Sequence, residues 1–164
     1  MPFSLSGKVG MVKRTVGEKS MNWKQEAVEK LRRYDAMRLA TINIPQELER
    51  LEIDAHSIRS ARTDSATVEG GGNRREEAMI NNILHRQELT WTLQQAQIWL
   101  QTTDRALTAL SSEEKQILHR LYIYPEKGGL ERLCKELEME TSSVYRRRDK
   151  ALKHFTMAYY GIDE

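Results

Sequence analysis

The chain has 164 residues, 30% of them charged and 39% hydrophobic, with a formal net charge of only +2. This length suffices for one hydrophobic core or two small ones, and the composition excludes disorder over most of the chain. The single cysteine, Cys134, excludes an intramolecular disulfide, and no apolar run approaches the roughly 18–20 residues of a membrane span. We therefore expect a cytoplasmic, all-α protein without contact with membranes.

Residues 1–20 have no sustained hydrophobic period and contain Gly7, Gly10 and Gly17. The basic segment followed by an apolar segment that a signal peptide needs is missing. We expect residues 1–20 to be a disordered extension, with a short basic arm that touches DNA as the alternative.

Residues 21–110 show helical periods and are expected to form an oligomerisation or partner-binding region. A first apolar stripe predicts a helix that ends near Asn43: Trp23, Ala27, Leu31 and Tyr34. Pro45 fits the first turn of a second helix, where a proline loses no helical hydrogen bond. That helix carries a two-heptad seam, which favours an antiparallel hairpin partner over a free coiled coil: Ile44, Leu48, Leu51, Ala55 and Ile58.

Residues 63–73 lack both a period and bulky side chains, so we expect a flexible loop. The three glycines at 70–72 do not predict a phosphate-binding loop, because no strand precedes them and no Gly-Lys-Ser/Thr follows.

Residues 74–110 contain neither proline nor glycine and predict one long helix, with Thr102 and Thr103 as the place for a break. The helix carries two apolar stripes. The first is Ile80, Leu84, Trp91 and Ile98, and the second is Leu89, Leu93, Ala96, Leu100, Thr103, Leu107 and Leu110. One stripe is enough to cover the N-terminal helices, so the second predicts a homodimer through residues 89–110. Contact with the C-terminal domain, or a wide face around a monomeric core, are the alternatives.

Residues 111–160 predict two short helices and a longer basic one. Ser111 and Glu114 have the spacing of a capping box, and the helix they open should end near Pro125. A second helix over 130–137 and a connection at 138–140 lead into a helix over 141–159. Two helices joined by a tight turn, the second one basic, are typical of a helix-turn-helix.

Basic charge is concentrated in the last of these helices. Residues 141–160 hold five Lys or Arg against one Asp, whereas 111–164 as a whole is neutral. Its apolar positions share one face: Val144, Ala151, Leu152 and Phe155. This pattern favours binding to double-stranded DNA. A three-helix cap with a solvated arginine face is the alternative.

The segments Leu133-Cys134-Lys135-Glu136-Leu137, Val144-Tyr145-Arg146 and Lys150-Ala151-Leu152 resemble region 4 of bacterial sigma-70 factors. They are more similar still to phage transcriptional regulators of the ArpU/RinA-like family. The resemblance covers about 111–160 and implies a sequence-specific activator of phage or prophage late genes, with host RNA polymerase as a partner. Two positions depart from it: Glu138 replaces the usual turn glycine, and Arg147 occupies a position that is commonly apolar.

In a helix-turn-helix the first turns of the second helix face the bases. The candidates for base contacts are therefore Thr141, Ser142, Ser143, Tyr145 and Arg146, of which only Arg146 has the forked donors that match guanine. Candidates for phosphate contacts are Arg148, Lys150 and Lys153. Arg147 lies closer to the buried side of the helix and is expected either to snorkel to solvent or to pair with an acidic side chain, rather than to contact bases.

No enzyme, cofactor or metal chemistry is expected. The four histidines lie far apart, and Cys134 falls on an apolar stripe where it is expected to pack. A small terminase-like packaging subunit, or a helical assembly protein or anti-regulator that does not bind DNA, are the alternative functions. We also expect 21–110 and 111–160 to be separable units.

Overall fold

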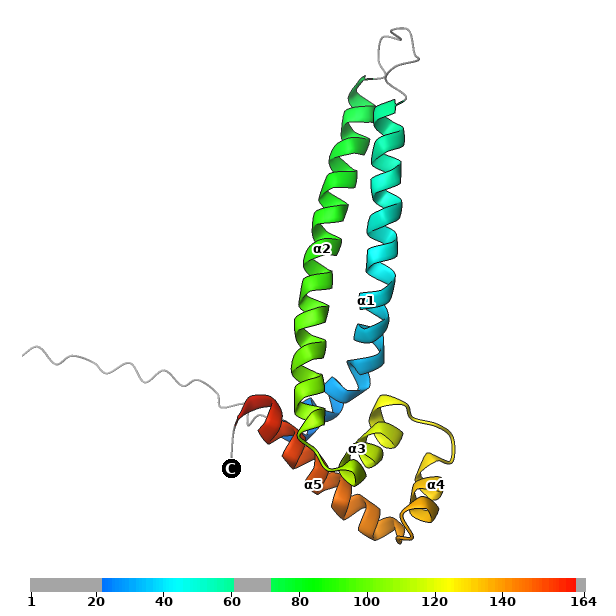
Figure 1. Cartoon of the computed structure of the whole chain (residues 1–164), viewed down its shortest axis with the longest axis vertical. Coiled ribbons are helices and arrows are strands. Elements are labelled where there is room, and N and C mark those ends of the chain that lie inside the picture. Colours follow the sequence, from blue (N-terminus) through cyan, green and yellow to red (C-terminus); the bar gives the residue numbers. More distant parts are fainter. Residues whose placement is uncertain (1–21, 61–71, 162–164) are drawn as a thin grey trace, which may run out of the picture.

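The computed structural model describes residues 22–60 and 72–161, and every regular element in these ranges is helical (Figure 1). The fold is thus all-α, as predicted. The expected disorder of residues 1–20 and most of the expected loop at 63–73 fall outside the described residues. The elements are α1 (Trp23–Ser60), α2 (Gly72–Thr108), α3 (Ser112–Leu118), the π-helical η1 (His119–Ile123), α4 (Gly129–Glu136) and α5 (Thr141–Tyr160).

Helices α1 and α2 run antiparallel as a long hairpin that stands on a base made by α3, η1, α4 and α5 (Figure 1). The seam predicted in α1 faces α2, with Leu51 and Ala55 buried. Asn82 donates to the carbonyl of Leu51 (2.8 Å), and Arg75 donates to that of Ile58 (2.9 Å). The predicted hairpin partner of this seam is therefore confirmed, and it is α2.

The prediction of two helices between residues 21 and 60 is wrong, because α1 passes through Pro45 without ending. A proline inside a helix removes one hydrogen bond and crowds the preceding turn. Leu51 and Ala55, beyond the proline, are nevertheless buried against α2, so tertiary contacts hold the helix together on both sides.

Helix α2 forms the single long helix predicted for this segment and is continuous at Thr102 and Thr103, the place considered for a break. The side chain of Thr103 is fully buried, and its hydroxyl donates to the carbonyl of Trp99 (2.8 Å) within the same helix. The polar group is satisfied without an interruption. The helix also starts at Gly72, so Gly72 and Asn73 are helical rather than part of a loop.

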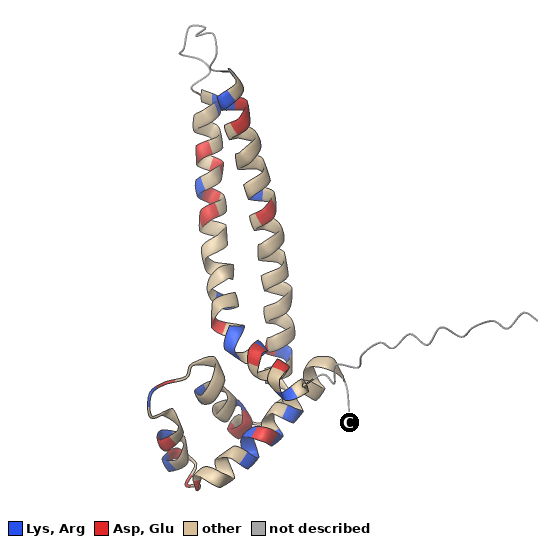
Figure 2. Cartoon of the chain, turned by 180° about the vertical axis from the view of Figure 1, so that it is seen from behind, with Lys and Arg blue, Asp and Glu red and all other residues tan. Residues whose placement is uncertain are grey.

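The two stripes of α2 have roles opposite to those predicted. Ala96, Thr103, Leu107 and Leu110 of the 89–110 stripe are buried inside the chain, so the predicted homodimer seam at 89–110 is wrong in its location. The exposed stripe is the other one: Ile80, Leu84, Trp91 and Ile98 are 49–63% exposed. Figure 2 shows a long stretch of α2 without charged residues, and residues 89–103 contain none.

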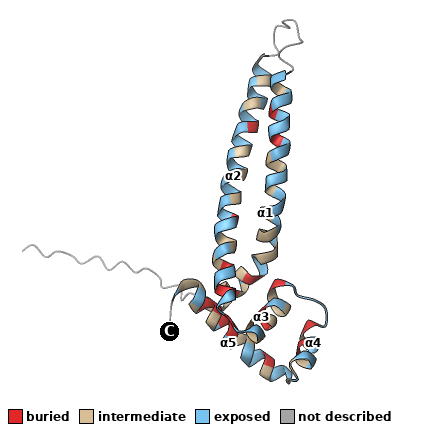
Figure 3. Ribbon diagram, viewed as in Figure 1, coloured by how far each residue is buried: buried red, intermediate tan, exposed pale blue. Residues whose placement is uncertain are grey.

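The main core lies at the base, where the start of α1 and the end of α2 meet η1, α3 and α5 (Figure 3). Its buried members come from both predicted units: Ala27, Leu31, Ala106, Leu107, Leu110, Leu118, Ile123, Ala151, Leu152 and Phe155. The boundary between residues 110 and 111 therefore does not divide the core.

Polar contacts of α1 reinforce the base. The Tyr34 hydroxyl donates to Asp104 of α2 (2.6 Å), and its burial and this contact raise its pKa to about 12. Tyr160 of α5 donates to Glu26 (3.2 Å), while the ammonium of Lys30 lies 4.7 Å from the ring centre of Tyr159. The C-terminal half of α5 is thus fixed to the hairpin.

None of the helices in residues 22–60 and 72–161 is long and apolar enough to cross a membrane.

Candidate nucleic-acid interface

A second, smaller core joins α3, α4 and the start of α5. Ile117, Leu133 and Val144 contribute one fully buried side chain from each helix. Partly buried side chains surround them, including Cys134, which packs here as predicted: Leu121, Leu130, Cys134, Leu137 and Met139. This core holds the three helices as one unit, which we call the reader (112–160).

The capping box predicted at the start of α3 is confirmed. The backbone N–H of Glu114 donates to the Ser111 hydroxyl (3.3 Å), and that of Ser111 donates to the Glu114 carboxylate (3.0 Å). His154 of α5 lies 2.6 Å from the same carboxylate. Burial raises the pKa of Glu114, but the Ser111 hydrogen bonds and His154 outweigh it, so the pKa lies below its ordinary value. The cap thus also ties α3 to α5.

The turn between α4 and α5 keeps a left-handed residue at the position where glycine is usual. Glu138 has φ +51° and donates to the carbonyl of Lys135 (3.3 Å), while Met139 donates to that of Cys134 (2.9 Å). These two bonds are those of a Schellman motif, which closes the end of a helix. A glutamate in this conformation is strained, and the packing of Met139 and Leu137 in the small core holds it there.

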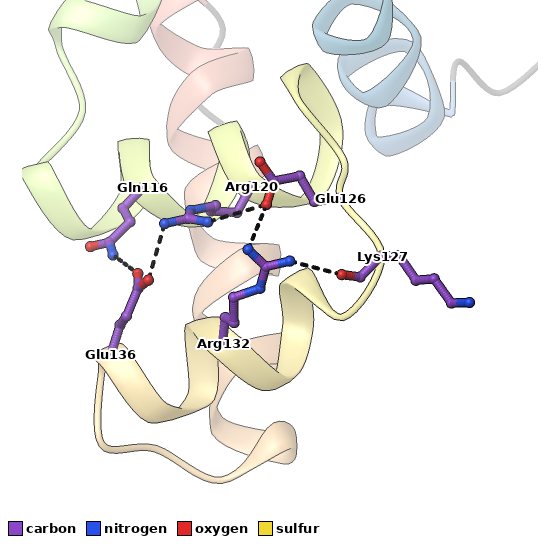
Figure 4. Close-up of polar contacts among 6 residues, drawn as sticks. All are labelled: Gln116, Arg120, Glu126, Lys127, Arg132 and Glu136. Atoms are coloured by element: carbon purple, nitrogen blue, oxygen red, sulfur yellow. Dashed lines mark hydrogen bonds and ion pairs between the residues drawn. The ribbon is translucent and has the colours of Figure 1, made fainter.

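A polar network fastens the loop between η1 and α4 (Figure 4). Arg120 lies 3.0 Å from Glu136 and 3.7 Å from Glu126, and Arg132 lies 2.9 Å from Glu126. Arg132 also donates to the carbonyl of Lys127, and Gln116 donates to Glu136 (2.7 Å). Both arginines are therefore engaged within the reader.

The outward face of α5 carries a row of cations. Arg146, Lys150 and Lys153 are spaced by four and three residues, so they share one face, and all three are exposed. Figure 2 shows Lys and Arg positions along α5 in blue. On the opposite face Val144, Ala151, Leu152 and Phe155 are fully buried. We call the three cations the basic ridge.

The structure brings the predicted base-contacting residues together on the first two turns of α5, at the end farthest from the hairpin (Figure 1). Thr141, Ser142, Tyr145 and Arg146 are exposed, whereas Ser143 is half-buried. The exposed Glu138 and Glu140 precede this end of the helix. Their negative charge is unfavourable for an anion at the start of the helix.

Two further cations of α5, Arg147 and Arg148, are paired with acidic side chains. Arg147 pairs with Glu113 of α3, which agrees with the predicted acidic partner. Arg148 lies 2.6 Å from Asp149, and its guanidinium lies 4.7 Å from the ring centre of Tyr145. Its side chain is only 22% exposed, so Arg148 is poorly placed for the predicted phosphate contact.

Asp149 has a second basic partner, from α1, which sequence reasoning missed. Lys24, at the start of α1, lies 2.8 Å from its carboxylate. Burial raises the pKa of Asp149, but Lys24 and Arg148 outweigh it and hold the pKa below its usual value. No local signal marks Lys24, because 125 positions separate the two residues. Glu113 did have a signal, namely an arginine at an otherwise apolar position of α5.

Among the described residues, no group of three His, Cys, Asp or Glu side chains is placed to hold a metal ion. No family model matches the chain, and no curated protein or solved structure matches it.

Proposed function

We propose that this chain is a DNA-binding transcription regulator that lays the first half of α5 in the major groove of double-stranded DNA. The observation that carries the proposal is the basic ridge, which lies on the free face of a helix whose other face is buried in the reader. Such a helix presents side chains to a groove without loss of the core beneath it.

Each outward residue has a distinct chemistry. The Arg146 guanidinium can donate two hydrogen bonds to guanine, which is worth roughly 1–3 kcal/mol of discrimination between bases. Lys150 and Lys153, one and two turns further along, suit phosphates of the backbone. The guanidinium of Arg148 covers the Tyr145 ring and is held by Asp149, so we assign it the role of positioning Tyr145.

The narrower assignment, a phage or prophage late-gene activator that contacts host RNA polymerase, rests on the resemblance to the ArpU/RinA-like family. The outward residues of α5 suggest recognition rather than catalysis, so we propose no enzymatic activity.

Selection of binding sites from random DNA tests the base contact. Wild type is expected to recover one motif, and Arg146→Ala the same motif with one base pair relaxed. Arg146→Lys should restore it only in part, because lysine lacks the fork. Identical motifs for all three proteins would remove Arg146 from base recognition.

The salt dependence of affinity tests the ridge separately. Each lost phosphate contact flattens the slope of log K against log salt by about 0.9, so Lys150→Ala with Lys153→Ala should flatten it by about 1.8. Arg59→Ala removes a charge from the far end of α1 and serves as the control, with an unchanged slope. An unchanged slope for the double variant would show that this face does not meet DNA.

A further inference from the structure

The outward face of α2 carries a regular stripe that the chain itself leaves uncovered. Its residues alternate in spacing between three and four over about 42 Å of helix, and each is exposed. They are Glu77, Ile80, Leu84, Gln87, Trp91, Gln94, Ile98, Gln101 and Arg105. A spacing of three and four is the heptad period that packs one helix on another.

The stripe lies opposite the 89–110 stripe on α2, and its members Gln87, Trp91 and Gln94 also border the groove between α1 and α2. Trp91 is two positions from Leu93, which belongs to the 89–110 stripe, and two positions correspond to about 200° around the helix. Between its two ends the stripe has no charge, although 30% of the chain is charged. Four large apolar side chains, each about half exposed or more, form a continuous band of the kind that marks an interaction surface.

The stripe is self-complementary about Trp91. Leu84 and Ile98 lie seven positions to either side of it, Gln87 and Gln94 lie four and three positions away, and Glu77 and Arg105 lie fourteen. Two copies of α2 that run antiparallel about a twofold axis at Trp91 bring Leu84 opposite Ile98. The same register brings the Gln87 amide, which both donates and accepts, to within one residue, or about 1.5 Å along the helix, of the position opposite Gln94.

The charges at the two ends select the direction of pairing. In the antiparallel arrangement Glu77 of each copy meets Arg105 of the other, which gives two ion pairs. A parallel arrangement would instead set Glu77 against Glu77 and Arg105 against Arg105, and like charges disfavour it. We propose that a second copy of this chain covers the stripe in this antiparallel register.

A shallow groove adjoins the middle of the stripe and has room for a bulky side chain at the axis. The groove lies between α1 and α2 and has a volume of about 770 Å³. Its lining combines the apolar Pro45, Leu48, Ile83 and Trp91 with the charged Glu49, Glu52 and Arg86. An indole that crosses the twofold axis lies beside the groove of the other copy.

The pairing does not depend on DNA binding. If the chain both pairs in this way and binds DNA, the two readers of the dimer lie at opposite ends of the paired hairpins. Each reader follows the end of α2, which continues for 17 residues, or about 26 Å, beyond Trp91. That places them about 50 Å apart along α2, farther than the 34–36 Å between half-sites on adjacent turns of DNA.

Sedimentation equilibrium of the full chain tests whether the stripe associates. Wild type is expected to be a dimer at tens of micromolar, and Leu84→Glu with Ile98→Glu should weaken association more than about 100-fold, because each charge would be buried without a partner. Ile53→Glu, at an equally exposed apolar position on α1, is the control and should leave the dimer intact. A monomeric wild type, or equal loss in the control, would overturn the proposal.

A charge exchange tests the register. Glu77→Arg alone and Arg105→Glu alone should each weaken the dimer roughly tenfold, since both ion pairs become repulsive. The double variant should recover wild-type affinity. In a parallel dimer each charge faces its own copy, so neither single variant would weaken association, and that result would overturn the antiparallel register.

Oxidative cross-linking gives an independent measure of the register. Trp91→Cys sits on the axis and should cross-link with itself, whereas Leu84→Cys should cross-link only when mixed with Ile98→Cys. Efficient self-cross-linking of Leu84→Cys would contradict the proposed arrangement.

Discussion

The base of the molecule and the far part of the hairpin are built from the same kind of helix but differ in how much they bury (Figure 3). At the base, five elements enclose fully buried side chains such as Leu31, Leu118 and Phe155. Beyond the base only α1 and α2 face each other. In the half of this hairpin that lies far from the base, the buried residues are Leu51, Ala55 and Asn82. Two helices cannot cover each other's outer faces, so the hairpin exposes more large apolar side chains than the base, where Tyr124 and Tyr145 are the exposed ones among the described residues.

This difference separates stability from recognition along the molecule. Free energy of folding is concentrated where several elements meet, since buried apolar area provides most of it. The far hairpin contributes less stability but offers a long face to a partner. The predictions below test that division, beginning with the largest effect.

Phe155→Ala should lower the free energy of unfolding by about 3–5 kcal/mol, because it empties the centre of the shared core. Leu51→Ala, in the hairpin, should cost about 2 kcal/mol, at the lower end of the range for leucine. Urea denaturation followed by circular dichroism and tryptophan fluorescence provides both values. If the hairpin unfolded at the same urea concentration in Phe155→Ala as in wild type, the base and the hairpin would be independent units after all.

Ser111→Ala should cost about 1 kcal/mol at neutral pH, the usual value of a lost N-cap. The pKa of Glu114 is depressed in the folded protein, so its contribution is present above its ordinary value near 4.5 and is lost as the pH falls through the folded pKa. Stability measured between about pH 5 and pH 3 should therefore fall less steeply in Ser111→Ala than in wild type. Equal slopes would mean that the Ser111 hydroxyl does not lower this pKa, because alanine keeps the backbone N–H that donates to the Glu114 carboxylate.

Glu138→Gly should raise the free energy of unfolding by up to about 1 kcal/mol, the smallest of these effects. Relief of the left-handed strain, roughly 1–2 kcal/mol, exceeds the entropy that glycine adds to the unfolded chain, roughly 0.4–1 kcal/mol. Glu140→Gly, which removes a neighbouring charge at a residue with φ −71°, is the control and should not stabilise. Loss of stability in Glu138→Gly would indicate that the carboxylate makes a favourable contact.

Much of the reader could be predicted from the sequence, because short-range interactions determine it. Ser111 and Glu114 cap a helix through groups three residues apart, and Val144, Ala151 and Leu152 share a face by helical period alone. The acidic partner of Arg147 was also predictable, since a guanidinium next to a core needs a counter-charge. The identity of that partner, Glu113, was not.

The remainder was decided by tertiary structure. Local rules end a helix at Pro45, but contacts with α2 keep α1 continuous. Lys24 reaches Asp149 only because the start of α1 packs on α5, a contact between residues 125 positions apart. Period also identified both stripes of α2 yet could not tell which one the chain covers. The spacing of apolar residues shows that one face of a helix is apolar. Which element packs on that face depends on long-range contacts, and the local spacing does not encode them.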